Sequence, residues 1–251
     1  MLNDIVKNLL NEVSGLIPTT GAFNIRNNGQ SEGRKSTENI DIVPKPNGAG
    51  LDIYVKPFTK NEDVHIPALI TADGVHDVAY NDFHIGEGAE IKIIAGCGIH
   101  NCGDQDSRHD GVHTFYVGKN SKVKYTEKHY GGGDGRGGKI MNPETVVYLD
   151  EGAFLQMEST QIRGVDSTKR YTRVEMESNA EAVVTERLLT HGHQIADSDM
   201  VIELNGEDSK GRVISRSVAQ EDSEQVFYPR MVGNAESFGH VQCDSIIIGN
   251  A

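Results

Sequence analysis

The sequence predicts an all-β protein, a right-handed parallel β-helix preceded by a short N-terminal α-helix. Apolar and polar residues alternate in many short segments, which is the period of β-strands. A turn of the Gly/Asn-Ala/Ser type also recurs, with intervals of 32, 32, 27, 29, 26 and 16 residues, at Gly88-Ala89, Asn120-Ser121, Gly152-Ala153, Asn179-Ala180, Asp208-Ser209, Asn234-Ala235 and Asn250-Ala251. Stacked coils that bury their inner faces against each other produce such a repeat. A β-sandwich is the alternative fold, but it does not need one turn motif seven times.

Residues 1–50 are expected to form an N-terminal helix and loop. Apolar residues between Met1 and Ile17 recur at helical spacing, which predicts an amphipathic helix that packs on its own domain and ends at Pro18. From Thr19 to Gly50 the composition is polar and rich in glycine. This segment is therefore expected to be a loop with at most short strands.

Residues 51–251 are expected to form the β-helix core domain. Period-two alternation begins at Leu51 and continues through most of the chain. Two segments, 104–111 and 130–138, lack a strand pattern and are predicted to be irregular excursions from the coils.

Composition and charge exclude several classes of partner. Lys and Arg number 24 and Asp and Glu number 37, which gives a net charge of −13. A nucleic acid would be repelled by this charge, so we expect no nucleic-acid partner. No apolar run approaches the roughly 20 residues of a membrane span, so no membrane association is expected. Three cysteines and no apparent signal peptide indicate free thiols in a reducing cytoplasm.

Two cysteines and a histidine lie close together after the apolar run 91–95. The spacing Cys97-x2-His100-x-Cys102 provides sulfur and nitrogen donors that suit zinc, copper or iron-sulfur species. These three residues are candidate metal ligands, expected where a strand ends and turns on glycine. The spacing does not fit a zinc finger. The alternative is that both cysteines are buried apolar residues while His100, His109 and His113 face water.

The third cysteine, Cys243, lies in an alternating strand pattern near the end of the sequence. His240 and Asp244 flank it. Arginines recur on the preceding strand patterns and are expected to pair with the excess acidic residues rather than to form an anion site; they are Arg170, Arg173, Arg187, Arg212 and Arg216.

Several segments together resemble the SufB/SufD core family of iron-sulfur cluster assembly proteins. These segments are Gly96-Cys97-Gly98-Ile99-His100, Gly164-Val165-Asp166-Ser167-Thr168-Lys169-Arg170, Glu186-Arg187-Leu188-Leu189-Thr190-His191-Gly192, Leu204-Asn205-Gly206-Glu207-Asp208-Ser209, Arg212-Val213-Ile214-Ser215-Arg216-Ser217 and Gln242-Cys243-Asp244-Ser245. The resemblance extends from about Ala22 to the last residue. It is closest to the short SufB-like member of archaeal and anaerobic bacterial systems.

The resemblance implies a cytoplasmic scaffold of the SUF machinery rather than an enzyme. Cys243 matches the family position that accepts sulfur and carries a transient iron-sulfur cluster, and Asp244 and His240 are candidates to tune it. Adjacent strand residues point to opposite faces, however, so both share a pocket with Cys243 only if the strand is bulged. Cys97, His100 and Cys102 belong to the block typical of the subgroup.

The same resemblance implies two kinds of protein partner. One is a SufC-type ABC ATPase, and the other is a second copy of the chain or a SufB/SufD paralogue. The family pattern continues beyond the last Asn-Ala turn with another coil and with C-terminal helices that bind the ATPase, and this sequence does not contain them.

Two other functions fit a β-helix. Some solenoids cleave acidic polysaccharides with clustered carboxylates, although a chain of charge −13 would repel a polyanion. An inert structural solenoid is the third possibility, and it predicts that all three thiols can be replaced without consequence.

Overall fold

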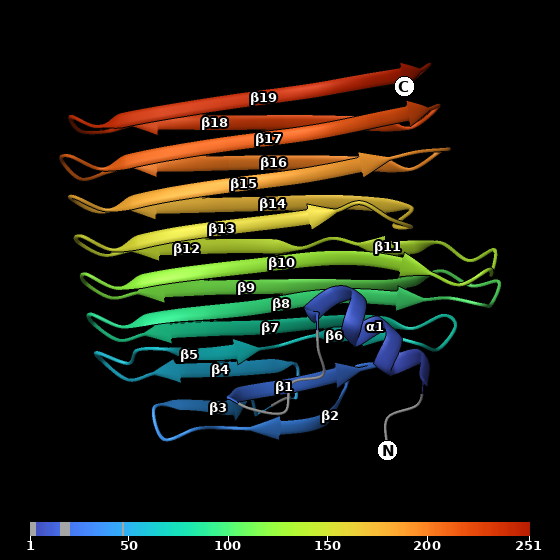
Figure 1. Ribbon diagram of the computed structural model, residues 1–251, viewed down its shortest axis with the longest axis horizontal. Coiled ribbons are helices and arrows are strands. Elements are labelled where there is room, and N and C mark those ends of the chain that lie inside the picture. The colour runs from blue at the N-terminus through green and yellow to red at the C-terminus, as the bar shows by residue number, and fades with distance from the viewer. Residues whose placement is uncertain (1–3, 16–20, 47) are drawn as a thin grey trace.

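The computed structural model describes residues 4–15, 21–46 and 48–251, and it is a parallel β-solenoid of about seven coils with one short N-terminal helix (Figure 1). Within the described residues, two strand pairs are antiparallel, β1 with β2 and β3 with β4, and the other pairs are parallel. The predicted parallel β-helix is confirmed, because a β-sandwich is built from antiparallel pairs.

The strands form two sheets that face each other across the interior. The helix-side sheet, on which α1 (Asp4–Ser14) packs, contains β1 (Ala22–Asn27), β2 (Gln30–Lys35), β5 (Glu62–His65), β6 (Ala68–Ile70), β8 (Glu90–His100), β10 (Lys122–Gly132), β13 (Phe154–Gln161), β15 (Glu181–Thr190), β17 (Lys210–Glu221) and β19 (Phe238–Gly249). The opposite sheet contains β3 (Ile40–Pro44), β4 (Gly50–Val55), β7 (His76–Ile85), β9 (Ser107–Val117), β11 (Lys139–Met141), β12 (Glu144–Leu149), β14 (Ser167–Met176), β16 (Ile195–Leu204) and β18 (Glu224–Gly233).

The first five predicted turns stack at one edge of the solenoid. Five of the seven have a positive φ at their first residue, namely Gly88, Asn120, Gly152, Asn179 and Asp208. Gly and Asn tolerate this left-handed backbone best, which explains the composition of the motif. The small residue that follows each of them is buried under the neighbouring coil.

The last two predicted turns do not belong to this stack. The backbone N–H of Asp208 donates to the carbonyl of Glu236, so the stacked turn of the last coil lies two residues after Asn234. Asn250 follows β19 at the other edge, where its N–H donates to the carbonyl of Glu221.

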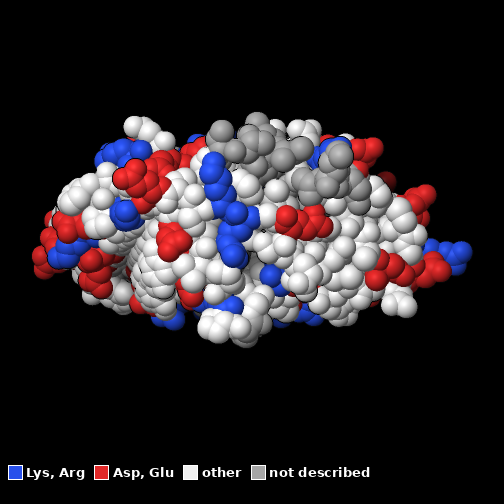
Figure 2. Space-filling view, turned by 90° about the horizontal axis from the view of Figure 1, so that it is seen from below, with Lys and Arg blue, Asp and Glu red and all other residues white. Residues whose placement is uncertain are grey.

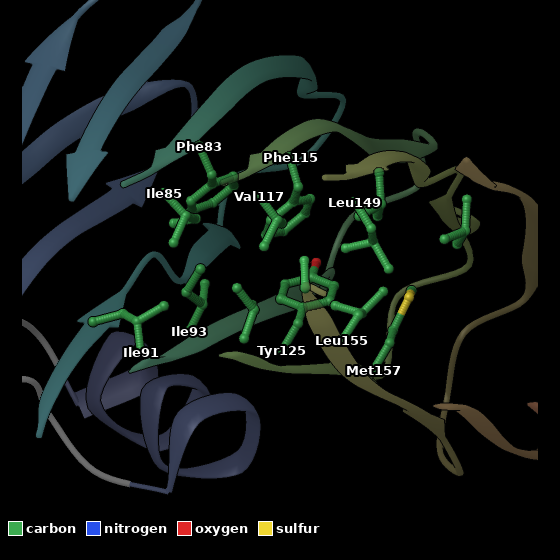
Figure 3. Close-up of a cluster of buried hydrophobic side chains, with 14 of the residues drawn as sticks. Phe83, Ile85, Ile91, Ile93, Phe115, Val117, Tyr125, Leu149, Leu155 and Met157 are labelled. Carbon is green, nitrogen blue, oxygen red and sulfur yellow. The ribbon is translucent and has the colours of Figure 1, made fainter. Parts of the chain in front are cut away.

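The apolar core fills the space between the two sheets. Phe83 and Phe115 of the opposite sheet stack with ring centroids 4.4 Å apart, and Tyr125 of the helix-side sheet meets Phe115 edge-on at 4.9 Å. Aliphatic side chains from both sheets surround these rings (Figure 3). The alternation of inward apolar and outward polar residues along each strand produces this core.

The excursions are shorter than the sequence predicts. β9 already begins at Ser107 and β10 extends to Gly132, so residues 107–111 and 130–132 belong to strands. Their inward side chains are polar or absent, and the backbone nevertheless continues the parallel ladder, with Gly132 opposite His100. The pattern of apolar residues therefore ends before the strand does.

Three short strands occupy part of the segment that was expected to be mainly loop. β1, β2 and β3 lie within residues 19–50 and are hydrogen-bonded into the two sheets. The described helix spans Asp4–Ser14, and the ends predicted at Met1, Ile17 and Pro18 lie outside the described residues. At 11 residues, α1 is too short to cross a bilayer, and the described part of the chain has no helix suited to that role.

Helix α1 covers the outer face of β8 with its apolar side. Val6, Leu9, Leu10 and Val13 are buried there. The helix comes so close because β8 has glycine at position 96, where a Cβ would lie 2.5 Å from the carbonyl oxygen of Val13.

Replacement of Gly96 by alanine is therefore expected to displace α1 and to lower the free energy of unfolding by about 1–3 kcal/mol, the usual cost of overpacking. Urea unfolding and hydrogen exchange of the helix amides measure the effect. Gly98→Ala is the matched control, since its Cβ meets only the ends of the Leu9, Leu69 and Val13 side chains at 3.2–3.3 Å. Equal effects of both changes would contradict the argument.

The end of the molecule nearest β2 shows charges of both signs. Figure 2 shows one short stripe of Lys and Arg on this face, among acidic and uncharged residues.

Candidate functional site

The three cysteines occupy three different environments, and none is in a disulfide. Cys97 is buried inside β8 and points into the interior, whereas Cys102 follows β8 and is exposed. Cys243 is exposed on β19.

The structure separates Cys97 from His100 and Cys102. β8 runs through to His100, so Cys97 faces the interior while His100 lies near α1 on the outer face of the same strand. The Nε2 atom of His100 is 3.2 Å from the sulfur of Cys102. Of the three predicted metal ligands, the structure thus brings together only His100 and Cys102. The expectation that Cys97 ends a strand was wrong, and so was the alternative that His109 and His113 face water, because both are buried.

Cys243 continues a row of polar side chains that runs through the solenoid interior. In the parallel register of the helix-side sheet, residues directly opposite each other point the same way. Cys243 lies opposite Ser215, and the same row continues through the strands with Glu186, Ser159 and Glu127. We call Glu127, Ser159, Glu186, Ser215 and Cys243 the polar row. Its four members before Cys243 are buried, and Cys243 is exposed.

The structure places Asp244 and His240 on the other face of β19. Asp244 accepts a hydrogen bond from Gln242 and lies 3.9 Å from Arg216, whereas the sulfur of Cys243 lies 3.7 Å from the hydroxyl of Ser245. β19 is regular along its pairing with β17, without a bulge that would turn these side chains together. Neither Asp244 nor His240 therefore shares a face with Cys243.

A buried arginine from the opposite sheet contacts two carboxylates of the polar row. Arg170 of β14 donates to Glu127 at 2.5 Å and lies 3.6 Å from Glu186. Burial alone would raise the pKa of Glu127, but the positive charge of Arg170 holds that pKa well below its ordinary value. Ser198 donates to Glu186 at 3.0 Å. Two carboxylates thus share one guanidinium in the interior, as expected for an arginine that balances acidic residues.

Next to the polar row, Cys97 and His129 are directly opposite each other on β8 and β10. Their ligand atoms and a carboxylate oxygen of Glu127 all lie within 4.8 Å of one another. The Nδ1 atom of His129 is 3.1 Å from Oε1 of Gln161. Among the described His, Cys and acidic residues, Cys97, Glu127 and His129 form a group that could hold a metal ion.

A second polar cluster lies toward the N-terminal coils. Arg26 binds Asp77 through two hydrogen bonds of 2.8 and 2.7 Å, and His109 lies 3.1 Å from the same carboxylate. Burial alone would raise the pKa of Asp77, but the hydrogen bonds from Arg26 and His109 hold it far below its ordinary value. Close by, Nδ1 of His113 is 2.8 Å from the hydroxyl of Tyr125.

Glu127, His129 and Gln161 are not among the site residues predicted from the sequence. Two signals point to them. Glu127 and His129 continue the period-two pattern of Val123 and Tyr125 with polar residues, and His129 and Gln161 follow Cys97 at one and two coil repeats of 32 residues.

The fold and the site define a parallel β-solenoid with free thiols and a charged interior. The family described as "SUF system FeS cluster assembly, SufBD core domain" matches residues 69–250. The chain belongs to this family.

Three similar curated proteins are named as iron-sulfur cluster assembly SufBD family proteins. An iron-sulfur cluster assembly SufBD family protein of Methanocaldococcus jannaschii is 27% identical over 202 residues, covering 79% of this chain and 62% of the relative. A SufBD family protein of Archaeoglobus fulgidus is 25% identical and covers 66% of this chain and 43% of the relative. A chloroplastic SufBD family protein of Arabidopsis thaliana is 28% identical and covers 65% of this chain and 30% of the relative. The chain thus spans less than two thirds of the length of these relatives.

Proposed function

We propose that this chain is a scaffold component of the SUF machinery that accepts sulfur at Cys243 and builds a nascent iron-sulfur cluster there. The observation that supports this proposal is the position of Cys243, a thiol in register with a row whose other members are buried and polar. A thiolate both attacks sulfane sulfur and binds iron.

The sulfur-accepting step is a thiol exchange. The Cys243 thiolate attacks the outer sulfur of a donor persulfide, the sulfur-sulfur bond of the donor breaks, and the donor leaves as a thiolate. Cys243 then carries the persulfide. Iron and the cluster are substrates of the scaffold, and Cys243 would supply one of the thiolate ligands.

Three further features belong to the same proposal. The scaffold works with a SufC-type ABC ATPase, it pairs with a second copy or with a SufB/SufD paralogue, and it resides in the cytoplasm. Membership of the SUF family and the free thiols support these features. Asp244 and His240 lie on the other face of β19. They would contact a partner protein or change the electrostatic potential near Cys243, rather than bind the cluster beside it.

The chain is not proposed to be a polysaccharide-cleaving enzyme. The paired carboxylates of the interior, Glu127 and Glu186, are 1% and 5% exposed and are held by Arg170, so a polymer cannot reach them.

Exchange of Cys243 for serine tests the scaffold proposal. The wild-type chain, incubated with glutathione persulfide, is expected to gain one sulfur atom at Cys243 by mass spectrometry, and anaerobic addition of iron and sulfide is expected to produce thiolate-to-iron absorption in the visible range. Both signals should disappear in Cys243→Ser and persist in Cys102→Ser, which removes the other exposed thiol. Persistence of both signals in Cys243→Ser would refute the role of this residue.

A further inference from the structure

Three residues inside the solenoid form a compact set of metal-ligand atoms. Parallel pairing places Cys97 of β8 directly opposite His129 of β10, and Glu127 lies two residues earlier on the same inward face of β10. Their exposed fractions are 4%, 1% and 1%. One sulfur, one nitrogen and one oxygen donor all lie within 4.8 Å of one another.

The hydrogen bonds of His129 leave one ring nitrogen available. Nδ1 of His129 has two neighbours, the side-chain oxygen of Gln161 at 3.1 Å and Nη2 of Arg170 at 3.4 Å. The oxygen can only accept and is the nearer of the two, so Nδ1 carries the hydrogen and donates it to Gln161. Thr168 donates to the same oxygen at 2.9 Å and thereby fixes its orientation. Nε2 of His129 is then an unprotonated acceptor that is buried without a hydrogen-bond partner. This is the arrangement in which an outer residue orients a metal-binding imidazole.

The carboxylate of Glu127 is oriented in the same way. Its Oε2 accepts from Arg170, while its Oε1 lies 3.5 Å from Nε2 of His129 and 3.3 Å from the hydroxyl of Tyr125. A tetrahedral metal ion with bonds of about 2.0–2.3 Å holds its ligands about 3.3–3.8 Å apart. The oxygen and the nitrogen already have this separation.

The charge of the interior group also favours a cation. Glu127 and Glu186 with Arg170 sum to one negative charge, which attracts a cation to this part of the interior. A divalent ion that displaces the thiol proton brings the group to zero net charge, because it adds two positive charges and creates one thiolate. A buried group of zero net charge is less costly than a charged one.

We propose that Cys97, Glu127 and His129 bind one divalent transition-metal ion, of the zinc or ferrous type, inside the solenoid. The mixture of thiolate, imidazole and carboxylate suits these ions. A cavity of about 20 Å³ lies between Cys97, His109 and His113 and has room for about one water near the sulfur. The site is separate from Cys243 and goes beyond the scaffold function proposed there.

Cobalt binding tests the site in a chain that carries Cys102→Ser and Cys243→Ser and so keeps Cys97 as its one thiol. Because the site is buried, Co²⁺ is added to the folded protein and, separately, during refolding. One Co²⁺ per chain is expected, with thiolate-to-cobalt absorption in the near ultraviolet and visible bands of a tetrahedral ion. The thiolate band should disappear in Cys97→Ser, and His129→Gln should bind at least about tenfold more weakly.

Two more variants separate binding from folding. Gln161→Ala leaves the three ligands in place and is expected to weaken cobalt about 10- to 100-fold, as loss of an outer-shell partner does. Ser159→Ala changes a neighbour in the polar row that is not a ligand, so its binding should be unchanged. Circular dichroism establishes that each variant folds.

Absence of cobalt uptake by the folded parent under both conditions would overturn the proposal, and so would an unchanged spectrum in Cys97→Ser and His129→Gln. In either case His129 serves only as a buried neighbour of Glu127 and Gln161. The parent already lacks Cys243, so this result is independent of the cluster experiment, and each proposal can fail without the other.

Discussion

Replacement of Arg170 by methionine is expected to lower the free energy of unfolding by about 3–5 kcal/mol, the usual cost of removing one partner from a buried ion pair. The guanidinium is 4% exposed and serves both Glu127 and Glu186. Methionine fills a similar volume but leaves two carboxylates in the interior without a counter-charge. Urea unfolding of the metal-free protein at neutral pH measures the change.

A variant that removes the charges together tests the cause. Arg170→Met combined with Glu127→Gln and Glu186→Gln has no ionised side chain in this group and should recover most of the lost stability, since apolar or neutral replacements of buried ion pairs are often tolerated. Arg173→Met is the matched control, because Arg173 lies on the outer face of the same strand and binds Glu203 there. If Arg170→Met were as mild as this control, the charge argument would be wrong.

The architecture could be predicted from the sequence because each coil repeats the same local requirements. A left-handed turn residue, a small buried residue and an alternating strand recur at the coil period, and Asn120 with Ser121 meets all of these requirements. The prediction lost accuracy where the period weakens. At Asn234 the motif occurs by composition alone, and the stacked turn forms two residues later, where the register places Glu236 beside Asp208.

The candidate sites were harder to predict, because closeness in sequence is a poor guide within a strand. Cys97 and His100 are three residues apart and lie on opposite faces, and the same parity separates Cys243 from His240 and Asp244. The partners of Cys97 come from the next coil, 30 and 32 residues later. Predicting these contacts requires the register between neighbouring strands. Where the inward residues are polar, apolar and polar residues no longer alternate, so the sequence does not identify the buried face.

Stability is expected to fall as the pH is lowered from about 6.5 to about 4, and His113 is expected to account for about 2–3 kcal/mol of this loss. Burial lowers the pKa of His113 to about 4, so the imidazole stays neutral in the native protein. The nearby charged or titratable groups Glu127, His109, His129 and Arg170 modify this value, and only Glu127 opposes the lowering.

The sign follows from proton uptake. An unfolded histidine has a pKa of about 6.5, so below that pH the unfolded chain binds a proton that the native chain excludes, and stability falls with pH until His113 is also protonated in the native state. Burial lowers the pKa of His65 in the same direction, and the depressed pKa of Asp77 adds a separate loss at more acidic pH. The effect of His113 is therefore isolated by substitution rather than read from the wild-type curve.

Unfolding by urea at pH 7.5 and pH 4.5, in the wild type and in His113→Gln, measures the contribution. The substitution also disturbs the contacts with Tyr125 and Asn81, but that cost is common to both pH values and cancels in their difference. The loss of unfolding free energy between pH 7.5 and pH 4.5 should be about 2–3 kcal/mol smaller in His113→Gln than in the wild type. It should be unchanged in His193→Gln, which alters an exposed turn. An unchanged difference in His113→Gln would mean that this imidazole is already protonated in the native interior at pH 4.5, which its apolar surroundings of Phe83 and Phe115 oppose.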